Sequence, residues 1–298
     1  MNVGEEQGSQ GRSGAIAPDP EERFDQPGGW LCRAHGEERL PVLVYLPGLH
    51  GDWTLVSSFR AAVRGRVRFF EFCYPRDAGV SLADHATAVL DALYAAGVSE
   101  AWLLAESFGS QVGWAMVEAL PRYPKIQIQG LFLAGGFVRY PVPLVLAATT
   151  RIAARLPPSA LRRLLGVYAM VAKARHRHAP ETREEIGEFV RRRLEPGDRE
   201  AMVHRLRLIA GSDPRPIASQ CGIPTWNLTG FWDPIVPWPL IHPWVRHHIP
   251  GWQGHRILML ADHTVLATQP GPSARWGLER MNLPRDSSAA DTAQASRA

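Results

Sequence analysis

The chain has 298 residues, of which 45% are hydrophobic, so it can bury a substantial core. Its formal net charge is only +4, and its most apolar region, 126–150, is interrupted by glycine, arginine and proline, which excludes an integral membrane segment. The three cysteines, Cys32, Cys73 and Cys221, form no close pair in sequence, which argues against a disulfide framework or a zinc site. Because the first residues are polar and acidic, with no secretory pattern, we expect a cytoplasmic protein.

The charge is distributed unevenly. Residues 139–215 contain 16 Lys plus Arg against 8 Asp plus Glu, so the rest of the chain is slightly acidic. A solvated helical face explains this excess, and attraction of an anionic substrate or lipid surface is the alternative. No zinc finger, helix-turn-helix or RNA-binding motif accompanies the basic residues, so we expect no nucleic-acid partner.

The first half of the chain alternates between strand and helix patterns. Residues 1–27 are polar and rich in glycine, and we expect them to be disordered. A strand over 40–46 runs into the glycine-rich turn 47–52, and a helix over 54–64 and a strand over 67–72 follow. The next helix begins at Ser81, with Asp84 placed to complete a capping box.

A serine then stands at the junction of a strand and a helix. The strand 101–104 leads into Ala-Glu-Ser-Phe-Gly, residues 105–109, and a helical pattern begins at Gln111. Small residues two positions on either side of Ser107 allow strand and helix to approach closely. Such a bend exposes the hydroxyl and directs the helix-side amides at the same space, where they can stabilise negative charge. Ser107 is therefore a candidate nucleophile, and a turn or N-cap serine is the alternative.

A strand over 128–134 is followed by a long stretch without strands. Residues 140–212, which we call the helical insertion, carry four helical patterns separated by prolines. Alternation resumes with a strand over 224–228, and we assign 28–139 and 213–283 to one α/β core. The tail 284–298 is polar and is expected to be disordered.

An acid and a histidine follow the last two expected strands. Asp233 comes after 224–228, and His263 comes after the strand 256–260. Parallel strands bring their carboxyl ends to one edge of a sheet, which would bring both residues to Ser107. Asp213 and Asp262 are rival acids; Asp213 lies in a turn and Asp262 is adjacent to the histidine. Rival histidines lie elsewhere, because we expect the first three to be exposed, the fourth to precede its strand and the last to lie on a helix: His176–His178, His247, His248, His255 and His85.

The order nucleophile, acid, histidine, each just beyond a strand, resembles the α/β-hydrolase fold. The resemblance implies an α/β protein with a mostly parallel, doubly wound sheet and an inserted all-helical cap, here 140–212. It also implies an oxyanion hole made by the backbone N–H groups of Phe108 and Leu49; Pro47-Gly48 stands where the family usually has His-Gly. The Leu-Pro-Gly-Leu and Glu-Ser-Phe-Gly motifs are similar to those of plant-type esterases and acyltransferases.

These features predict a serine hydrolase without a cofactor or metal, which cleaves a carboxylic ester or related acyl bond of a small molecule through an acyl-Ser107 intermediate. His50 and Trp232, which flank the motif loops, are candidate substrate-binding residues. An acyltransferase with an alcohol acceptor and a hydrolase-like binding protein without turnover are the alternatives. The oligomeric state stays open.

Overall fold

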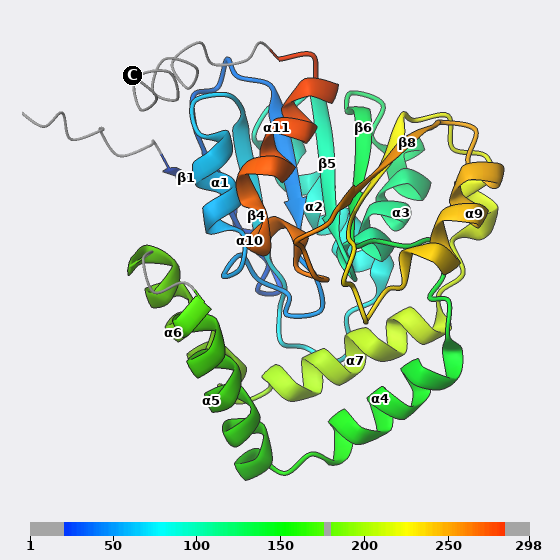
Figure 1. Ribbon diagram of the computed structural model, residues 1–298. Coiled ribbons are helices and arrows are strands. Elements are labelled where there is room, and N and C mark those ends of the chain that lie inside the picture. The colour runs from blue at the N-terminus through cyan, green and yellow to red at the C-terminus, as the bar shows by residue number, and fades with distance from the viewer. Residues whose placement is uncertain (1–20, 176–179, 284–298) are drawn as a thin grey trace, which may run out of the picture.

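A single mostly parallel sheet forms the centre of the molecule. The computed structural model describes residues 21–175 and 180–283. The strand order is β1-β2-β4-β3-β5-β6-β7-β8, and every neighbouring pair from β4 to β8 is parallel (Figure 1). The strands are β1 (Glu21–Arg23), β2 (Leu31–His35), β3 (Val42–Leu46), β4 (Arg68–Cys73), β5 (Glu100–Glu106), β6 (Gln127–Ala134), β7 (Thr225–Gly230) and β8 (Trp252–Leu258).

Helices cover both faces of the sheet, which confirms the predicted fold class (Figure 1). One face carries α1 (Ser57–Val63), α10 (Val265–Thr268) and α11 (Pro270–Arg280). The other face carries α2 (Leu82–Ala95), α3 (Gly109–Ala119), the 3-10 helix Leu120–Arg122, α8 (Arg215–Ala218) and α9 (Trp238–His248). Ser81 caps α2 with the reciprocal Asp84 bonds that the sequence predicts.

Alternation along the central strands divides the core in two. In β3, Val44 and Leu46 face the α2/α3 side, whereas Leu43 and Tyr45 face the α1/α11 side. Since successive strand residues point to opposite faces, a strand covered on both sides needs apolar residues at nearly every position. The near-continuous apolar sequence of β3 follows from this burial.

The N-terminal edge of the sheet differs from the sequence-based expectation. Residues 21–27, expected to be disordered, contain β1, which pairs antiparallel with β2, and β2 pairs antiparallel with β4. These strands are short and partly polar, and the partner of β2 lies far along the chain. Residues 1–20 and 284–298, also expected to be disordered, lie outside the described residues.

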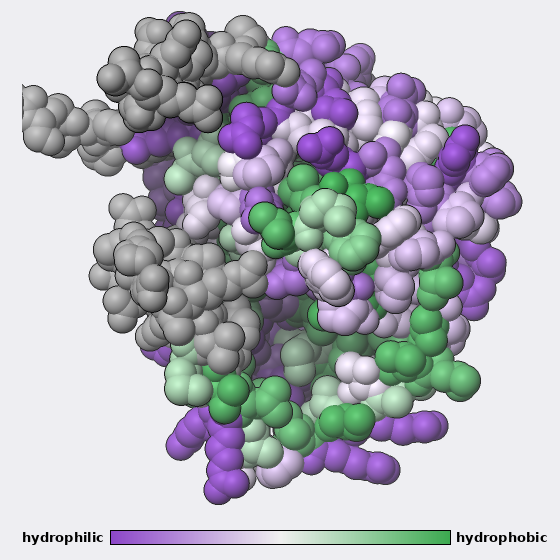
Figure 2. Space-filling view, in the orientation of Figure 1, coloured by the Kyte–Doolittle hydropathy of each residue, from purple (hydrophilic) through white to green (hydrophobic). Residues whose placement is uncertain are grey.

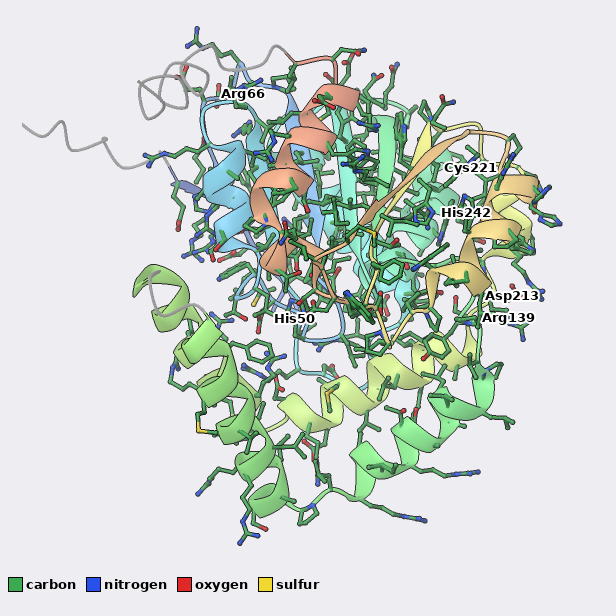
Figure 3. All side chains as sticks on the ribbon, in the orientation of Figure 1. His50, Arg66, Arg139, Asp213, Cys221 and His242 are labelled. Atoms are coloured by element: carbon green, nitrogen blue, oxygen red, sulfur yellow. The ribbon has the colours of Figure 1, made fainter. Side chains whose placement is uncertain are left out.

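The helical insertion consists of α4 (Pro143–Arg155), α5 (Pro158–Arg175), α6 (Pro180–Arg193) and α7 (Asp198–Gly211). It lies along the edge of the sheet at which the parallel strands end (Figure 1). Arg139, before α4, and Asp213, after α7, form an ion pair of 3.4 Å, so the insertion leaves and rejoins the core at one place (Figure 3). Among the described helices, none has the length and apolar character needed to span a membrane.

A buried carboxylate anchors the antiparallel edge to the parallel part of the sheet. Glu71 in β4 is fully buried and accepts hydrogen bonds from Arg60 at 2.6 and 2.9 Å and from Arg33; His35 lies 3.2 Å away. Burial alone would raise the pKa of Glu71, but the hydrogen bond to His35 and the charges of Arg60 and Arg33 hold that pKa below its ordinary value.

We expect Glu71→Gln to lower the free energy of unfolding at pH 7 by about 2–3 kcal/mol, because it leaves two guanidinium groups without their shared anion. With a folded pKa below 4.5, the carboxylate stabilises the fold above that pH, and the contribution is lost on further acidification. Urea unfolding at pH 7 and pH 4 should therefore show a smaller pH dependence in the variant. The exposed Glu37, paired with Arg39, provides the control: Glu37→Gln should cost less than about 0.5 kcal/mol.

Candidate active site

Ser107 occupies a strained turn between β5 and α3. Its φ is +49°, a left-handed conformation that is uncommon for residues other than glycine, and its N–H donates to the Ala134 carbonyl at 3.0 Å. Gly109 makes the turn sterically feasible, since a Cβ there would lie 2.1 Å from the carbonyl oxygen of Leu46. The small residue expected two positions after the serine is therefore required by contact with β3.

The structure brings the three predicted catalytic residues together. His263 Nε2 lies 2.9 Å from Ser107 Oγ, and His263 Nδ1 lies 2.8 Å from Asp233 Oδ2. The other carboxylate oxygen of Asp233 accepts hydrogen bonds from the backbone N–H groups of Ile235 at 2.9 Å and Val236 at 2.8 Å. Asp233 is buried, so its carboxylate is oriented by these amides on one side and by the imidazole on the other.

Two glycines allow the histidine loop to approach the neighbouring strands. Gly135, just after β6, has φ +55°, and a Cβ there would lie 3.0 Å from the carbonyl oxygen of His263. Gly230, at the end of β7, lies so close to the loop that a Cβ would come within 2.1 Å of the Asp262 carbonyl oxygen. The position of the imidazole therefore depends on backbone contacts that no larger residue would permit.

The two predicted oxyanion-hole amides flank the serine. Phe108 follows Ser107 at the start of α3, and Leu49 belongs to the turn after β3. That turn lies against the nucleophile, since a Cβ on Gly48 would be 3.4 Å from Ser107 Cβ. Within the described part of the chain, neither Leu49 nor Phe108 donates its backbone N–H to a protein acceptor, so both donors remain available to a ligand.

Two buried arginines of the helical insertion bind the turn that carries Leu49. From α7, Arg205 donates to the carbonyl oxygens of Leu49 at 3.0 Å and Pro75 at 3.2 Å. From the end of α6, Arg193 donates to the His50 carbonyl oxygen and pairs with Asp52. We call these two side chains and residues 49–52 the arginine clamp. The sequence analysis did not identify it, because its partners are more than 140 residues apart in the chain.

The guanidinium of Arg205 also lies directly over Gly51. A Cβ at that position would lie 2.4 Å from Arg205 Cζ, and Gly51 has φ +73°. Arg193 is held in turn by Asp198 at the start of α7, at 3.1 Å. The helical insertion therefore supplies part of the structure that fixes the turn next to Ser107.

A buried polar chain extends from the residue before the nucleophile. Tyr45 donates its hydroxyl hydrogen to Glu106, and its oxygen lies 3.4 Å from His50 Nε2. Burial and the nearby Glu106 carboxylate raise the pKa of Tyr45. Burial lowers the pKa of His50, although Glu106 and Asp52 oppose that shift, so its imidazole is favoured in the neutral form. Figure 3 shows His50 at the edge of the sheet facing the helical insertion, and its ring lies 6.2 Å from that of Phe189.

The remaining predicted residue, Trp232, lies at the surface. It is 69% exposed and contacts Phe231 edge to face at 5.1 Å, one residue before the buried Asp233. No ring contact or side-chain hydrogen bond within the described structure joins Trp232 to Ser107 or His263.

The rival residues occupy other positions. Asp213 pairs with Arg215 and Arg139, and Asp262 accepts hydrogen bonds from Thr264. His255 was expected before its strand, and this expectation is wrong: it lies inside β8, 2.7 Å from Thr229 Oγ1. The strand begins four residues earlier than the apolar pattern indicated, because its first half is polar and carries a glycine.

Other histidines have structural partners. Buried His85 accepts a hydrogen bond from the indole of Trp30 at 3.0 Å, and burial lowers its pKa to about 3. His247 and His248 lie 2.6 and 2.9 Å from carbonyl oxygens one turn back in α9, and His176–His178 fall outside the described residues. Among the side chains that are described, no group of three or more His, Cys, Asp or Glu could hold a metal ion.

Comparison with known proteins identifies the fold. No protein-family model and no curated protein sequence matches the chain. Solved structures do match: a hydrolase from Pseudomonas aeruginosa has a TM-score of 0.68 at 15% identity, covering 87% of this chain and 97% of its own. An esterase from Thermogutta terrifontis has a TM-score of 0.64 at 18% identity, with 89% and 98% coverage.

An enol-lactonase from Burkholderia xenovorans gives a TM-score of 0.67 at 17% identity, with 85% of this chain and 96% of that chain covered. The sheet order, the turn at Ser107 and these likenesses agree. The chain has the α/β-hydrolase fold, as its sequence motifs predicted.

Proposed function

We propose that the protein is a serine hydrolase that cleaves a carboxylic ester or a related acyl bond. The proposal rests above all on the continuous hydrogen-bonded array from Ser107 through His263 to Asp233, at 2.9 and 2.8 Å. The structural neighbours that act as an esterase and an enol-lactonase support it through fold analogy. A binding protein without turnover would have no need to retain all three groups in this geometry.

In the proposed reaction, Ser107 Oγ attacks the acyl carbonyl carbon while His263 Nε2 accepts the hydroxyl proton. Asp233 orients the imidazole and stabilises its cationic form. The N–H groups of Leu49 and Phe108 stabilise the oxyanion, and collapse of the tetrahedral intermediate expels the alcohol, which takes the proton from His263. Water then attacks acyl-Ser107 by the same steps in reverse and releases the carboxylic acid.

The substrate is proposed to be a small molecule with an apolar acyl group. His50 lies beside Gly48, whose Cβ would be 3.3 Å from the imidazole, and therefore borders the space next to Ser107. Its favoured neutral form offers either a donor or an acceptor without adding charge to the site. Exposed Trp232, on the loop that carries Asp233, is proposed to contact the outer part of the substrate.

A fluorophosphonate probe tests the nucleophile directly. We expect one adduct per chain, located on the Ser107 peptide by mass spectrometry and absent from Ser107→Ala. Ser219→Ala, which changes an exposed serine away from the site, should label like the wild type. A folded wild-type protein that remains unlabelled, or an adduct on another serine, would rule the proposal out.

The acceptor is tested with the same enzyme form. When an ester substrate is supplied with an excess of a second alcohol, a hydrolase releases mainly free acid, whereas an acyltransferase forms mainly the new ester. We expect free acid to dominate. Predominant transesterification would leave the acyl-Ser107 intermediate in place and replace water by an alcohol as the acceptor.

A further inference from the structure

The outer side of the helical insertion combines aliphatic and basic side chains. The insertion packs inward through α7 and α6, against which α4 and α5 lie. No acidic residue occurs anywhere between Glu118 and Glu181, so α4 and α5 contain none. This absence distinguishes these helices from an ordinary solvated helix, in which acidic and basic residues alternate.

Most of α4 is exposed. Leu146 and Ala153 are its buried residues, and they make a narrow inner stripe. On the outer side, Leu144 is 84% exposed, and Arg151 and Arg155 follow it at seven and eleven positions, which places all three on one side of the helix. Ile152, 65% exposed, lies seven positions after exposed Val145 on the adjacent stripe.

The first part of α5 repeats this composition. Arg163, Val167 and Met170 follow helical spacing, and all three are exposed; Arg162 and Leu164 are exposed beside them. Figure 2 shows the result along the lower rim of the molecule, where hydrophobic surface is interrupted by long hydrophilic side chains that project outward. None of the four arginines of α4 and α5 named here pairs with a carboxylate among the described side chains.

We propose that this surface, the exposed aliphatic and arginine side chains of α4 and early α5, binds the surface of an anionic lipid bilayer. Aliphatic side chains gain free energy by entering the headgroup boundary, and arginines above them pair with lipid phosphates. Charge decides between occupants. A second copy of the chain would bring the same unpaired arginines into contact, whereas an anionic membrane neutralises them.

Membrane contact at α4 and α5 is distinct from spanning, for which no described helix is suited. It also does not depend on Ser107, so it can be tested whether or not the protein is a hydrolase. Bound in this way, the helical insertion would lie between the lipid and the edge of the sheet that carries Ser107 (Figure 1).

Co-sedimentation with vesicles tests the proposal, using wild-type protein and Ser107→Ala to separate binding from any lipid hydrolysis. We expect binding at low salt to phosphatidylcholine vesicles that contain phosphatidylglycerol, little binding to phosphatidylcholine alone, and release at high salt. The combined Arg→Gln change at positions 151, 155, 162 and 163 should weaken binding at least about tenfold. A Gln change at Leu144, Ile152, Leu164 and Met170 should do the same with the net charge unchanged.

A matched control separates a local surface from general charge. Arg→Gln at the exposed positions 122, 246, 256 and 275 removes the same charge outside the helical insertion, and binding should stay within about twofold of the wild type. Absence of binding to anionic vesicles, or an equal loss in this control, would overturn the proposal. So would a wild-type dimer in solution that the Leu/Ile/Met→Gln variant dissociates, because the surface would then bind a second copy. Thermal unfolding of every variant checks that the fold is intact.

Discussion

Ser107→Ala is expected to reduce kcat on any ester substrate by at least about 10⁴-fold while the protein stays folded. The substitution removes only the hydroxyl, and the backbone contacts that hold residue 107 do not involve it. The melting temperature should therefore change little or rise, since a smaller side chain leaves the strained turn unaltered. Measurement of kcat, KM and thermal unfolding on the same preparations separates the chemistry from the fold.

The three proposed catalytic residues should also behave as one unit. His263→Ala and Asp233→Asn are each expected to lower kcat by about 10³–10⁴-fold or more, and the triple variant should be little worse than Ser107→Ala alone. Multiplicative losses would contradict the shared mechanism, because residues that act in one proton transfer cannot be removed independently. Asp262→Asn, at the rival carboxylate adjacent to the histidine, serves as the control and should retain kcat within about tenfold.

Arg205→Met is expected to lower kcat by about a hundredfold with KM nearly unchanged. The buried guanidinium fixes the Leu49 and Pro75 carbonyl oxygens, and methionine retains much of the packing but no hydrogen-bond donor. Loss of the arginine clamp would free the turn to move the Leu49 N–H away from the oxyanion, and one misplaced donor costs about 10²–10³ in rate. Arg205 acts here through the turn, as a positioning residue.

A structural defect alone would not produce that pattern. Affinity for a trifluoromethyl ketone, which forms an oxyanion on Ser107, should fall in parallel with kcat, whereas affinity for a product alcohol should not. Arg207→Met, at an exposed position on the same helix, should match the wild type in both. An Arg205→Met enzyme with full kcat and full ketone affinity would show that the turn holds its conformation without the clamp.

Much of the parallel core could be predicted from local sequence. Continuous apolar strands followed by glycine-rich or polar turns mark β3, β5, β6 and β7, because burial on both faces demands that pattern. The antiparallel β1 and β2 were missed, since their pattern is short and polar and β2 is stabilised by pairing with β4 across about forty residues. The start of β8 was missed for a related reason: its first residues are polar and half-buried.

The candidate site divides in the same way. Ser107, Asp233 and His263 could be proposed because each follows a strand, and parallel strands bring such positions to one edge. The Arg193 and Arg205 contacts could not, because an arginine on an amphipathic helix gives no sequence indication of which distant carbonyl it will reach. Glu106 could be recognised only as a residue near the nucleophile, and its bond to Tyr45 depends on the register between β3 and β5.

The ion pair between Arg139 and Asp213 gives the fold a modular architecture. Because the two ends of the helical insertion meet at a single junction, the whole segment could be exchanged for another by joining these positions, with no strand of the sheet cut or reordered. Evolution could thus refit the entrance of the same chemical centre for different environments. The loss would be the two arginine contacts at residues 49–52, which any replacement segment would have to supply anew.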